Sequence, residues 1–376
     1  MKAFLVTSLL SALWANAQLI GPVGPTTALS QKTRECSILD YGAVNDNSTD
    51  VADSIEKAFN TCVLPHPGSR LIVPDGKYLI KRSVVLSNGT NWALQLDGLI
   101  TLAYGGNWTV DRDGQFLQNG LTIINPVDFE FYSSNGKGAI QGQGYIYRNL
   151  ADTFRPRLVR LISPIDTAVH DIILVDSPKF HIVFDFAENL EVYHLTIRGA
   201  NLGSYDGVDV VGTNYWVHDI EVTNRDECVS VKSPSNHALI ENLVCNQAGS
   251  GISIGSLNVS ASIANIVSKF SLVEDFSIWT ESGTSVVNKI SNVYGHSDDS
   301  YGEADRIKSL ASGQSPTPYT STYTVTATPS GWTAPSFPTW AAASTGYGTD
   351  VPIPVYTPAA LWKPNGDYEK HYWGSF

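Results

Sequence analysis

The chain has 376 residues, of which 24 are basic and 36 are acidic, and its formal net charge is −12. A surface this acidic argues against nucleic acid or an anionic membrane as a partner. It would also repel an acidic polymer at neutral pH, so a substrate of that kind would require a low pH or a local basic group.

Residues 1–17 carry the pattern of a secretory signal peptide. Lys2 gives a positive start, an apolar run extends from Phe4 to Trp14, and residues 15–17 supply the small side chains of a cleavage site. The run is too short to span a bilayer, and no later apolar stretch of about 18 residues follows it. We therefore expect a secreted, extracellular protein, and we expect it to be a monomer.

The four cysteines agree with export, because disulfides persist outside the cytosol. Cys36 and Cys62 bracket one stretch of helical pattern, and Cys228 and Cys245 lie 17 residues apart, so two local bridges are the simplest of the three possible pairings. No Cys/His spacing indicates zinc, and we expect no metal and no cofactor. Four N-x-S/T sequons are candidate glycosylation sites: Asn47, Asn88, Asn107 and Asn258.

One helix is predicted, followed almost entirely by strands. Apolar residues recur at helical spacing after the capping residues 48–50; they are Val51, Ile55, Ala58, Phe59 and Cys62. Beyond Leu71, short runs of Val, Ile, Leu and Phe alternate with Gly, Asn, Asp and Ser, which indicates strands separated by turns.

These strands carry a repeat of a β-branched residue, any residue, an Asp, His or Asn, and a large apolar residue. The copies are Val169–Ile172, Val192–Leu195, Val217–Ile220, Ile240–Leu243 and Ile263–Ile266, at steps of 23, 25, 23 and 23 residues. One turn per 23 or so residues, with side chains alternately inward and outward, describes a coil of parallel β-helix. Leucine-rich repeats share this period but need a Leu/Asn consensus that is absent. We therefore predict an all-β, right-handed parallel β-helix over residues 18–300, with the helix as its N-terminal cap.

Two features interrupt the repeat. A further copy, Val273–Phe276, begins only 10 residues after Ile263, and half a coil cannot go once around the helix, so a register break is predicted near 263–273. After about His296, Ser, Thr, Pro, Gly and Tyr dominate without a repeat. Residues 301–376 are therefore expected to form a Ser/Thr/Pro-rich extended tail, lying on the β-helix or partly disordered.

Three carboxylates are predicted to share one face of the β-helix. Asp206 lies about one coil before Asp226 and Glu227. Clustered acidic groups repel each other, and such arrangements are frequent at functional sites. Glycoside hydrolysis needs a carboxylic acid to protonate the leaving oxygen and a carboxylate to activate water, about 6.5–9.5 Å apart in inverting enzymes. The structural alternative is that such residues accept backbone N–H groups in turns, which is our interpretation of Asp209.

Three ordered segments surround these residues: 204–210 (SYDGVDV), 222–233 (VTNRDECVSVKS) and 249–256 (GSGISIGS). They resemble family 28 of the glycoside hydrolases, the polygalacturonase family, whose corresponding segments look like Asn-Thr-Asp-Gly, Asp-Asp-Cys and Gly-His-Gly-x-Ser-Ile-Gly-Ser. The resemblance covers roughly residues 36–283, and three motifs in order make it specific.

Where the chain departs from polygalacturonases, it looks like the rhamnogalacturonase branch. Glu227 replaces the second Asp of the pair, Lys232 stands where Asn is usual, and Ser250 replaces the motif histidine. By position, the resemblance implies that Asp226 is the general acid, with a pKa raised by burial and by neighbouring charges, and that Asp206 and Glu227 hold and activate the water. Lys232 is a candidate to bind a substrate carboxylate, with a solvated surface lysine as the alternative, and Ser250 is a candidate to hydrogen-bond sugar.

The implied activity is endo-hydrolysis, with inversion, of galacturonate–rhamnose linkages in the pectic polysaccharide rhamnogalacturonan I. The alternatives are polygalacturonase or another family 28 specificity, a wall-binding remnant with impaired catalysis, and a calcium-dependent pectate lyase on the same fold. In rhamnogalacturonases several coils separate the segments that correspond to Ser256 and Trp279, which here have 22 residues between them. We therefore expect an internal deletion of several coils.

Overall fold

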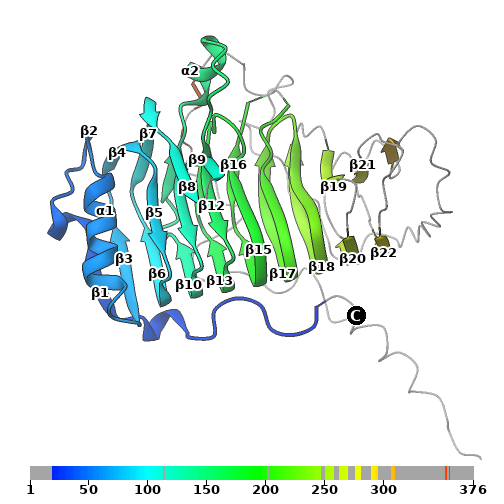
Figure 1. The fold of residues 1–376 in the computed structure, drawn as a ribbon, viewed down its shortest axis with the longest axis horizontal. Coiled ribbons are helices and arrows are strands. Elements are labelled where there is room, and N and C mark those ends of the chain that lie inside the picture. Colours follow the sequence, from blue (N-terminus) through cyan, green and yellow to red (C-terminus); the bar gives the residue numbers. More distant parts are fainter. Residues whose placement is uncertain are drawn as a thin grey trace, which may run out of the picture.

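The computed structural model describes residues 19–112, 115–200, 203–246, 250–257, 262–269, 276–280, 289–294, 306–309, 352–353 and 355. Parallel strands stack coil upon coil into a right-handed β-helix, as predicted (Figure 1). The strands are β1 (Arg34–Ser37), β2 (Asp46–Asp50), β3 (Ser69–Val73), β4 (Lys77–Arg82), β5 (Val84–Ser87), β6 (Thr90–Leu96), β7 (Leu99–Asn107), β8 (Thr109–Arg112), β9 (Gln115–Ile124), β10 (Val127–Tyr132), β11 (Ala139–Gln141), β12 (Arg157–Ile162), β13 (Ile165–His170), β14 (Ile173–Val175), β15 (Ile182–Tyr193), β16 (Thr196–Arg198), β17 (Val208–Thr223), β18 (Glu227–Asn246), β19 (Ser250–Leu257), β20 (Ser262–Lys269), β21 (Phe276–Thr280), β22 (Lys289–Tyr294) and β23 (Arg306–Ser309).

A short helix closes the N-terminal end of the β-helix, as predicted (Figure 1). It consists of α1 (Ala52–Ala58) and the π-helical turn η3 (Phe59–Val63). The five apolar residues from which it was predicted, Val51, Ile55, Ala58, Phe59 and Cys62, are all buried. A second helix, α2 (Gly144–Asn149), was not predicted, because six residues are too few to show helical periodicity.

Four of the five predicted repeat copies stack on one another. Val169 lies opposite Val192, Val192 opposite Val217, and Val217 opposite Ile240. The polar third position is where the chain bends: Asp171, His194 and Asp219 have φ of 57°, 51° and 52°. Short polar side chains adopt this left-handed conformation more readily than β-branched or bulky apolar ones. The repeat in the sequence therefore marks the bend of each coil, at its third position, as well as the buried apolar residues around it.

The fifth copy was assigned to the wrong bend. Ile263 lies opposite Ser235 rather than Ile240, and its bend residue Asn265 follows the ladder of Asn214 and His237. Polar residues with positive φ recur at both places, as Asp171 and His194 do at one and Asn214 and His237 at the other, so one sequence pattern fits either of them. The step from Ile240 to Ile263 is therefore not a coil, although its length is that of one.

The short spacing after Ile263 has the same explanation. Phe276, the last residue of the copy at 273–276, pairs with Ile252, whereas Ile263 pairs with Ile290. The two copies thus lie on different sheets of the coil, and a spacing of 10 residues between them does not require a register break. Residues 270–275 themselves lie outside the described residues.

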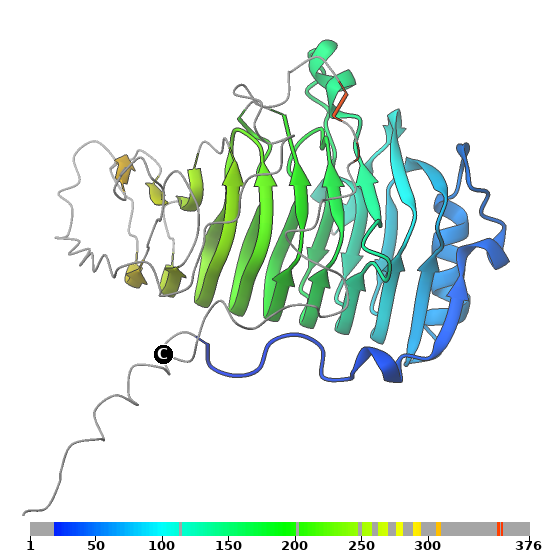
Figure 2. The ribbon, with the colours of Figure 1, turned by 180° about the vertical axis from the view of Figure 1, so that it is seen from behind.

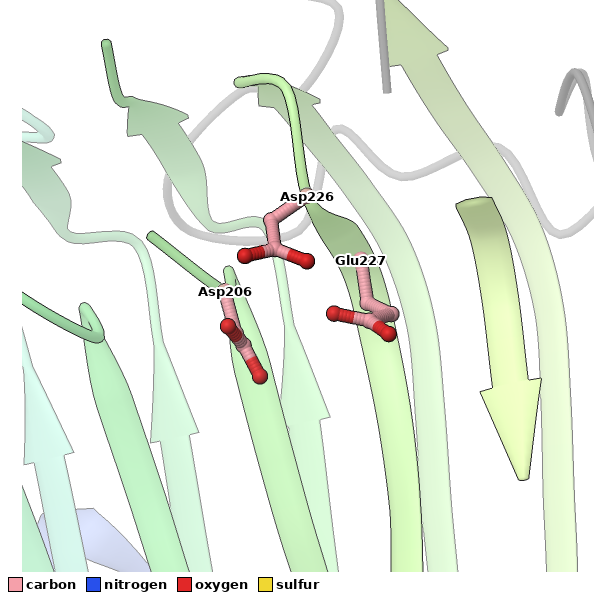
Figure 3. Close-up of side chains that lie close together, drawn as sticks. All are labelled: Asp206, Asp226 and Glu227. Atoms are coloured by element: carbon pink, nitrogen blue, oxygen red, sulfur yellow. The ribbon is translucent and has the colours of Figure 1, made fainter. Parts of the chain in front are cut away.

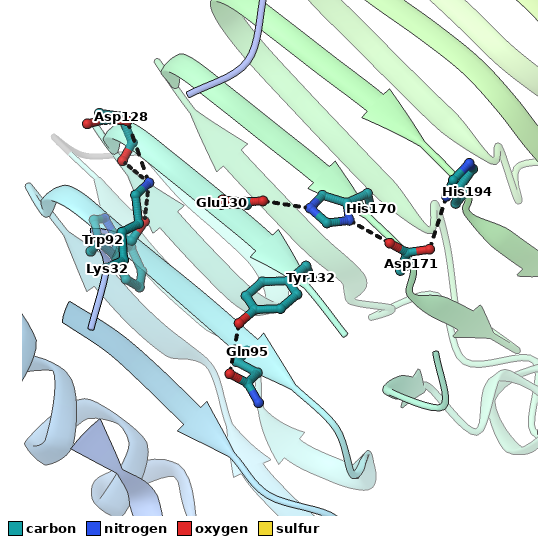
Figure 4. Close-up of polar contacts among 9 residues, drawn as sticks. All are labelled: Lys32, Trp92, Gln95, Asp128, Glu130, Tyr132, His170, Asp171 and His194. Atoms are coloured by element: carbon teal, nitrogen blue, oxygen red, sulfur yellow. Dashed lines mark hydrogen bonds and ion pairs between the residues drawn. The ribbon is translucent and has the colours of Figure 1, made fainter. Parts of the chain in front are cut away.

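The segment before β1 runs along the ladder of bends that contains Asn214 and His237 (Figures 1 and 2). Its main-chain N–H groups donate hydrogen bonds from Thr27 to Asp128 Oδ1 and from Ile20 to Asn214 Oδ1, each of 3.0 Å. The ammonium group of Lys32 is fully buried and donates to the carbonyl oxygen of Asp128 at 2.9 Å and to that of Trp92 at 3.3 Å (Figure 4). This segment therefore ties several coils together.

A row of polar side chains follows the other set of bends, the one that contains Asp171 and His194 (Figure 4). His170 contacts Glu130 through Nε2 at 2.9 Å and Asp171 through Nδ1 at 2.7 Å. Burial lowers the pKa of His170, but hydrogen bonds and charges from these two carboxylates outweigh it and raise the pKa to about 9. The imidazole also stacks on Tyr193 at a centroid distance of 4.5 Å, so that it holds three coils together.

Both predicted disulfides are present. Cys36 joins Cys62, and Cys228 joins Cys245, with Cα–Cα distances of 5.9 and 6.1 Å. The sequon residues Asn47, Asn88 and Asn107 are exposed, and Asn258 lies outside the described residues. Glycosylation of these residues stays a prediction.

The predicted tail is described at a few points. Arg306–Ser309 forms β23, which pairs with β21, so the stack extends past residue 300. Ile353 is buried against Ala139, Ile173 and Val175, and its carbonyl oxygen accepts a hydrogen bond from Gln141 Nε2 at 3.2 Å. The predicted signal peptide lies outside the described residues. Among the described helices, none has the length and apolar character needed to cross a membrane.

Candidate active site

Two neighbouring strands bring the three predicted carboxylates together on the outer surface. Asp206 stands just before β17, and Asp226 and Glu227 stand at the start of β18. Val208 lies opposite Val229, and the N–H group of Gly207 donates to the carbonyl oxygen of Glu227 at 2.8 Å, so that Asp206 and Glu227 share one outward row. Figure 3 shows the three side chains converging.

Gly207 makes this close stacking possible. A Cβ atom at this position would lie 2.6 Å from the carbonyl oxygen of Cys228, which no side chain can accommodate without a shift of the backbone. The Asp-Gly pair in the first motif thus has a steric reason for its glycine. Any larger residue here would push the Asp206 coil away from the Glu227 coil.

The three carboxylates are close enough for their charges to repel each other strongly. One oxygen from each lies within 4.8 Å of the others, Asp206 is 4% exposed, and Asp226 and Glu227 are half-buried. This oxygen spacing is shorter than the separation of carboxyl groups expected for an inverting enzyme, although it joins the nearest oxygens and not the carboxyl carbons. The same three oxygens are also the set that could hold a divalent cation.

Burial and mutual repulsion keep protons on this cluster. Burial, followed by the charges of Asp209, Asp226 and Glu227, raises the pKa of Asp206 well above its usual value. Burial and the hydrogen bond and charge of Asp226 raise the pKa of Glu227 to about 8. The raised pKa that the sequence led us to expect at Asp226 stays a prediction, and the structure raises the pKa of its neighbours Asp206 and Glu227.

Asp226 is held in place by backbone groups of the preceding coil. Its Oδ2 accepts a hydrogen bond from the N–H group of Tyr205 at 3.0 Å and another from that of Ser204. Asn224 fixes the same turn, because its Nδ2 donates to the carbonyl oxygens of Tyr205 and Glu227 at 3.0 and 3.1 Å. Asp226 is therefore positioned by the coil that carries Asp206.

His181 supports the main chain beneath Asp206. The imidazole is fully buried, and Nδ1 donates to the carbonyl oxygen of Asp206 at 2.9 Å. Burial lowers the pKa of His181 to about 4, so the ring stays neutral under ordinary conditions. Sequence reasoning missed Asn224 and His181, since neither carries a recognisable pattern.

Lys232 supplies a positive charge to the cluster. Its Nζ lies 3.7 Å from Asp206 Oδ2 and 4.0 Å from Asp209 Oδ1, and its side chain is 27% exposed. Asp209, which we expected to accept backbone N–H groups in a turn, is instead buried beside Asp206 and Lys232. Burial raises the pKa of Asp209, and the charge of Lys232 opposes this rise.

Ser250 follows one coil after the carboxylates. It begins β19 and lies opposite Glu227 in the parallel ladder. Its position in the stack therefore matches the expected row, while its side chain is outside the described part of the structure.

Acid/base cleavage of a glycosidic bond requires one carboxyl group that donates a proton and one that activates water, and this cluster brings three carboxyl groups together. The chain belongs to the glycosyl hydrolases family 28, whose family model matches residues 68–286. Among solved structures, endo-xylogalacturonan hydrolase from Aspergillus tubingensis is similar with a TM-score of 0.57 and 20% identity, covering 70% of this chain and 73% of that chain. This likeness confirms the fold.

Two relatives share more of the sequence. A probable rhamnogalacturonase A of Aspergillus niger is 42% identical over 295 residues, which are 76% of this chain and 63% of the relative. Rhamnogalacturonase A of Emericella nidulans is 34% identical over 440 aligned positions, covering 93% of this chain and 82% of the relative. The chain thus spans about three fifths of the length of the first of these relatives.

The second alignment is longer than the chain itself. Its share of this chain, 93% of 376 residues, is about 350 residues, so about 90 of the 440 aligned positions have no counterpart here. At the 23 to 25 residues per coil of the repeat, this is the length of three to four coils.

Proposed function

We propose that this chain hydrolyses galacturonate–rhamnose linkages within rhamnogalacturonan I, with inversion, and that it does so as a secreted monomer. The observation that carries the proposal is the cluster of Asp206, Asp226 and Glu227, in which burial and neighbouring charges raise the pKa of Asp206 and Glu227. The names of the relatives supply the substrate class. Inversion rests on the family resemblance and not on the oxygen distances.

In the proposed mechanism Asp226 protonates the leaving oxygen, and Asp206 and Glu227 hold and activate the attacking water. The proton that Glu227 retains up to about pH 8 lies within the same hydrogen-bonded pair as Asp226. It can therefore reach Asp226 without crossing solvent. Lys232 would contact a galacturonate carboxylate, and Ser250 a sugar hydroxyl.

The shorter length favours one alternative. If the three to four coils without a counterpart belong to the cleft, the chain would bind pectin through its remaining coils and cleave it slowly or not at all. Another family 28 specificity, such as polygalacturonase, is disfavoured by Glu227 and Ser250. A calcium-dependent lyase would use the carboxylates as cation ligands.

One assay separates these possibilities. We expect reducing ends to be released from rhamnogalacturonan and almost none from polygalacturonate, with unchanged rates in EDTA and with rates that fall as the pH rises above about 8, where Glu227 loses its proton. Equal rates on both polymers would contradict the specificity, and unsaturated products that vanish with EDTA would indicate the lyase. If the chain melts cooperatively and binds rhamnogalacturonan but releases no products, the alternative of a wall-binding remnant with impaired catalysis would be established. Proton NMR of the first anomer released tests inversion.

A further inference from the structure

Three basic residues lie on the N-terminal side of the carboxylate cluster: Arg155, Arg157 and Lys179. In the described part of the chain none of them forms an ion pair, whereas two nearby arginines do: Arg148 contacts Asp176 at 2.7 Å, and Arg160 contacts Asp185 at 2.5 Å. In a chain of net charge −12, a group of cations without a carboxylate in direct contact is unexpected. Arg155 donates a hydrogen bond to the hydroxyl group of Tyr205 at 3.0 Å, whereas the side chains of Arg157 and Lys179 contact no carboxylate of the described residues and are open to one from a ligand.

Arg157 lies in the same outward row as the carboxylates. Leu158 N–H donates to the carbonyl oxygen of Phe180, and His181 N–H donates to that of Asp206, so the row runs from Arg157 through Phe180 to Asp206. Neighbouring strands lie about 4.8 Å apart, which places Arg157 two coils, or about 10 Å, from Asp206. The next member of the row is Glu227, one coil further on.

The two cations converge on one aromatic ring. The guanidinium carbon of Arg157 lies 5.2 Å from the ring centre of Phe180, and the ammonium of Lys179 lies 5.1 Å from it. Arg157, Lys179 and Phe180 are all partly exposed, so a ligand can reach them. Arg155 stands beside them over the ring of Tyr205 at 5.5 Å.

Holding these groups together without an anion is costly. Burial lowers the pKa of Lys179, the positive charges of Arg157 and Arg155 lower it further, and the charges of Asp206 and Asp209 oppose this only in part. The Nε atom of Arg157 is buried and has no hydrogen-bond partner among the described residues. A bound carboxylate would relieve the repulsion and could take a bidentate contact from the guanidinium.

We propose that Arg157 and Lys179, with Phe180 between them, form a subsite for the carboxylate of a galacturonate unit two coils before Asp206. This inference rests on the proposed function, because it assumes a uronate polymer lying along the row. In an alternating polymer the carboxylates recur at every second sugar. If each sugar spans about one coil, a carboxylate recurs every two coils, which is the spacing between Arg157 and the cluster.

The test compares binding of rhamnogalacturonan oligosaccharides with binding of the same oligosaccharides after their carboxyl groups have been reduced to alcohols. We expect the double variant Arg157→Gln/Lys179→Gln to raise the Kd of the acidic oligosaccharides about tenfold or more and to leave that of the reduced ones unchanged. Arg34→Gln/Lys57→Gln, which removes two exposed charges elsewhere, is the matched control and should bind as the wild type does.

The subsite would be refuted if the double variant raised the Kd of both ligands equally, or if it left the Kd of the acidic oligosaccharides unchanged. Lys179→Gln alone serves as a second variant if the double variant melts at a lower temperature. It should raise the Kd of the acidic oligosaccharides by a smaller factor and leave that of the reduced ones unchanged. Cleavage by the wild type is scored separately. A wild type that binds in this carboxylate-dependent way but releases no reducing ends would keep the subsite and refute the hydrolase.

Discussion

Replacing Lys232 with methionine should move the pH dependence of the enzyme to higher pH. The ammonium lies 3.7 Å from Asp206 Oδ2, and its charge lowers the pKa of Asp206, Asp209 and Glu227. At 3.7 Å, an effective dielectric constant between about 40 and 80 gives an interaction of about 1–2 kcal/mol, a range chosen because the side chain is 27% exposed. Since 1.36 kcal/mol corresponds to one pKa unit, we expect a shift of about one unit.

The direction follows from the charge. Without the ammonium Asp206 and Glu227 hold their protons to a higher pH. The limb that reports the ionised base therefore moves upward, and the limb that reports the proton passed from Glu227 to Asp226 moves with it. The assay is kcat/KM on rhamnogalacturonan across the pH range at constant ionic strength. Lys57→Met, which removes an exposed lysine of α1, is the control and should leave both limbs in place.

The outcome also separates the two roles of Lys232. A shift of both limbs with unchanged KM would mean that the lysine acts on the carboxylates alone. A raised KM that disappears on carboxyl-reduced substrate would add contact with the substrate. If both limbs stay where they are, the coupling deduced from the 3.7 Å contact is wrong.

Three further predictions concern other parts of the molecule. Asp226→Asn should lower kcat by a factor on the order of 10³ while the melting temperature stays within a few degrees of the wild type, as general-acid loss requires; a tenfold loss would contradict its role. His170, whose pKa is raised to about 9, stabilises the fold fully below about pH 6.5 and loses this effect as the pH rises through 9, so His170→Gln should cost up to about 3 kcal/mol at pH 6 and much less at pH 10 in denaturant titrations. Replacing Cys36 and Cys62 with serine opens a loop with a sequence separation of 26 and should cost about 3 kcal/mol in the same titration; an unchanged midpoint would argue against the loop-entropy account.

The sequence predicted that Asp206, Asp226 and Glu227 lie together because they come from adjacent coils. Asp206 and Glu227 are 21 residues apart, close to the period of the repeat, so their stacking follows from the period alone. Gly207 then shows why the first motif cannot vary, since the coils approach too closely there for a Cβ atom. What the period could not give was the electrostatic balance, because burial decides which carboxyl keeps its proton.

The basic residues were missed for the opposite reason. Arg157 is separated from Asp206 by two coils of unequal length, 23 residues to Phe180 and then 26 to Asp206, and Lys179 belongs to the intermediate coil. No motif connects them, and only the backbone ladder shows that they share a row. The unexplained need for a local basic group in an acidic chain was the one signal available, and it led to Lys232 alone.

The pairing of each coil with its neighbours limits how far the absence of coils can disturb the rest of the structure. Each coil of a β-helix contacts only its neighbours, so whole coils can be absent while the stack on either side keeps its register. The described strands fit this expectation, since β19 pairs with β21 and β20 with β22 one coil apart. The carboxylates depend on the coils immediately around them, from Phe180 to Ser250, and all of these are present. Coils missing beyond β19 would therefore leave the carboxylate cluster and the basic residues on its N-terminal side in place, and under the proposed function they would remove substrate contacts on the C-terminal side.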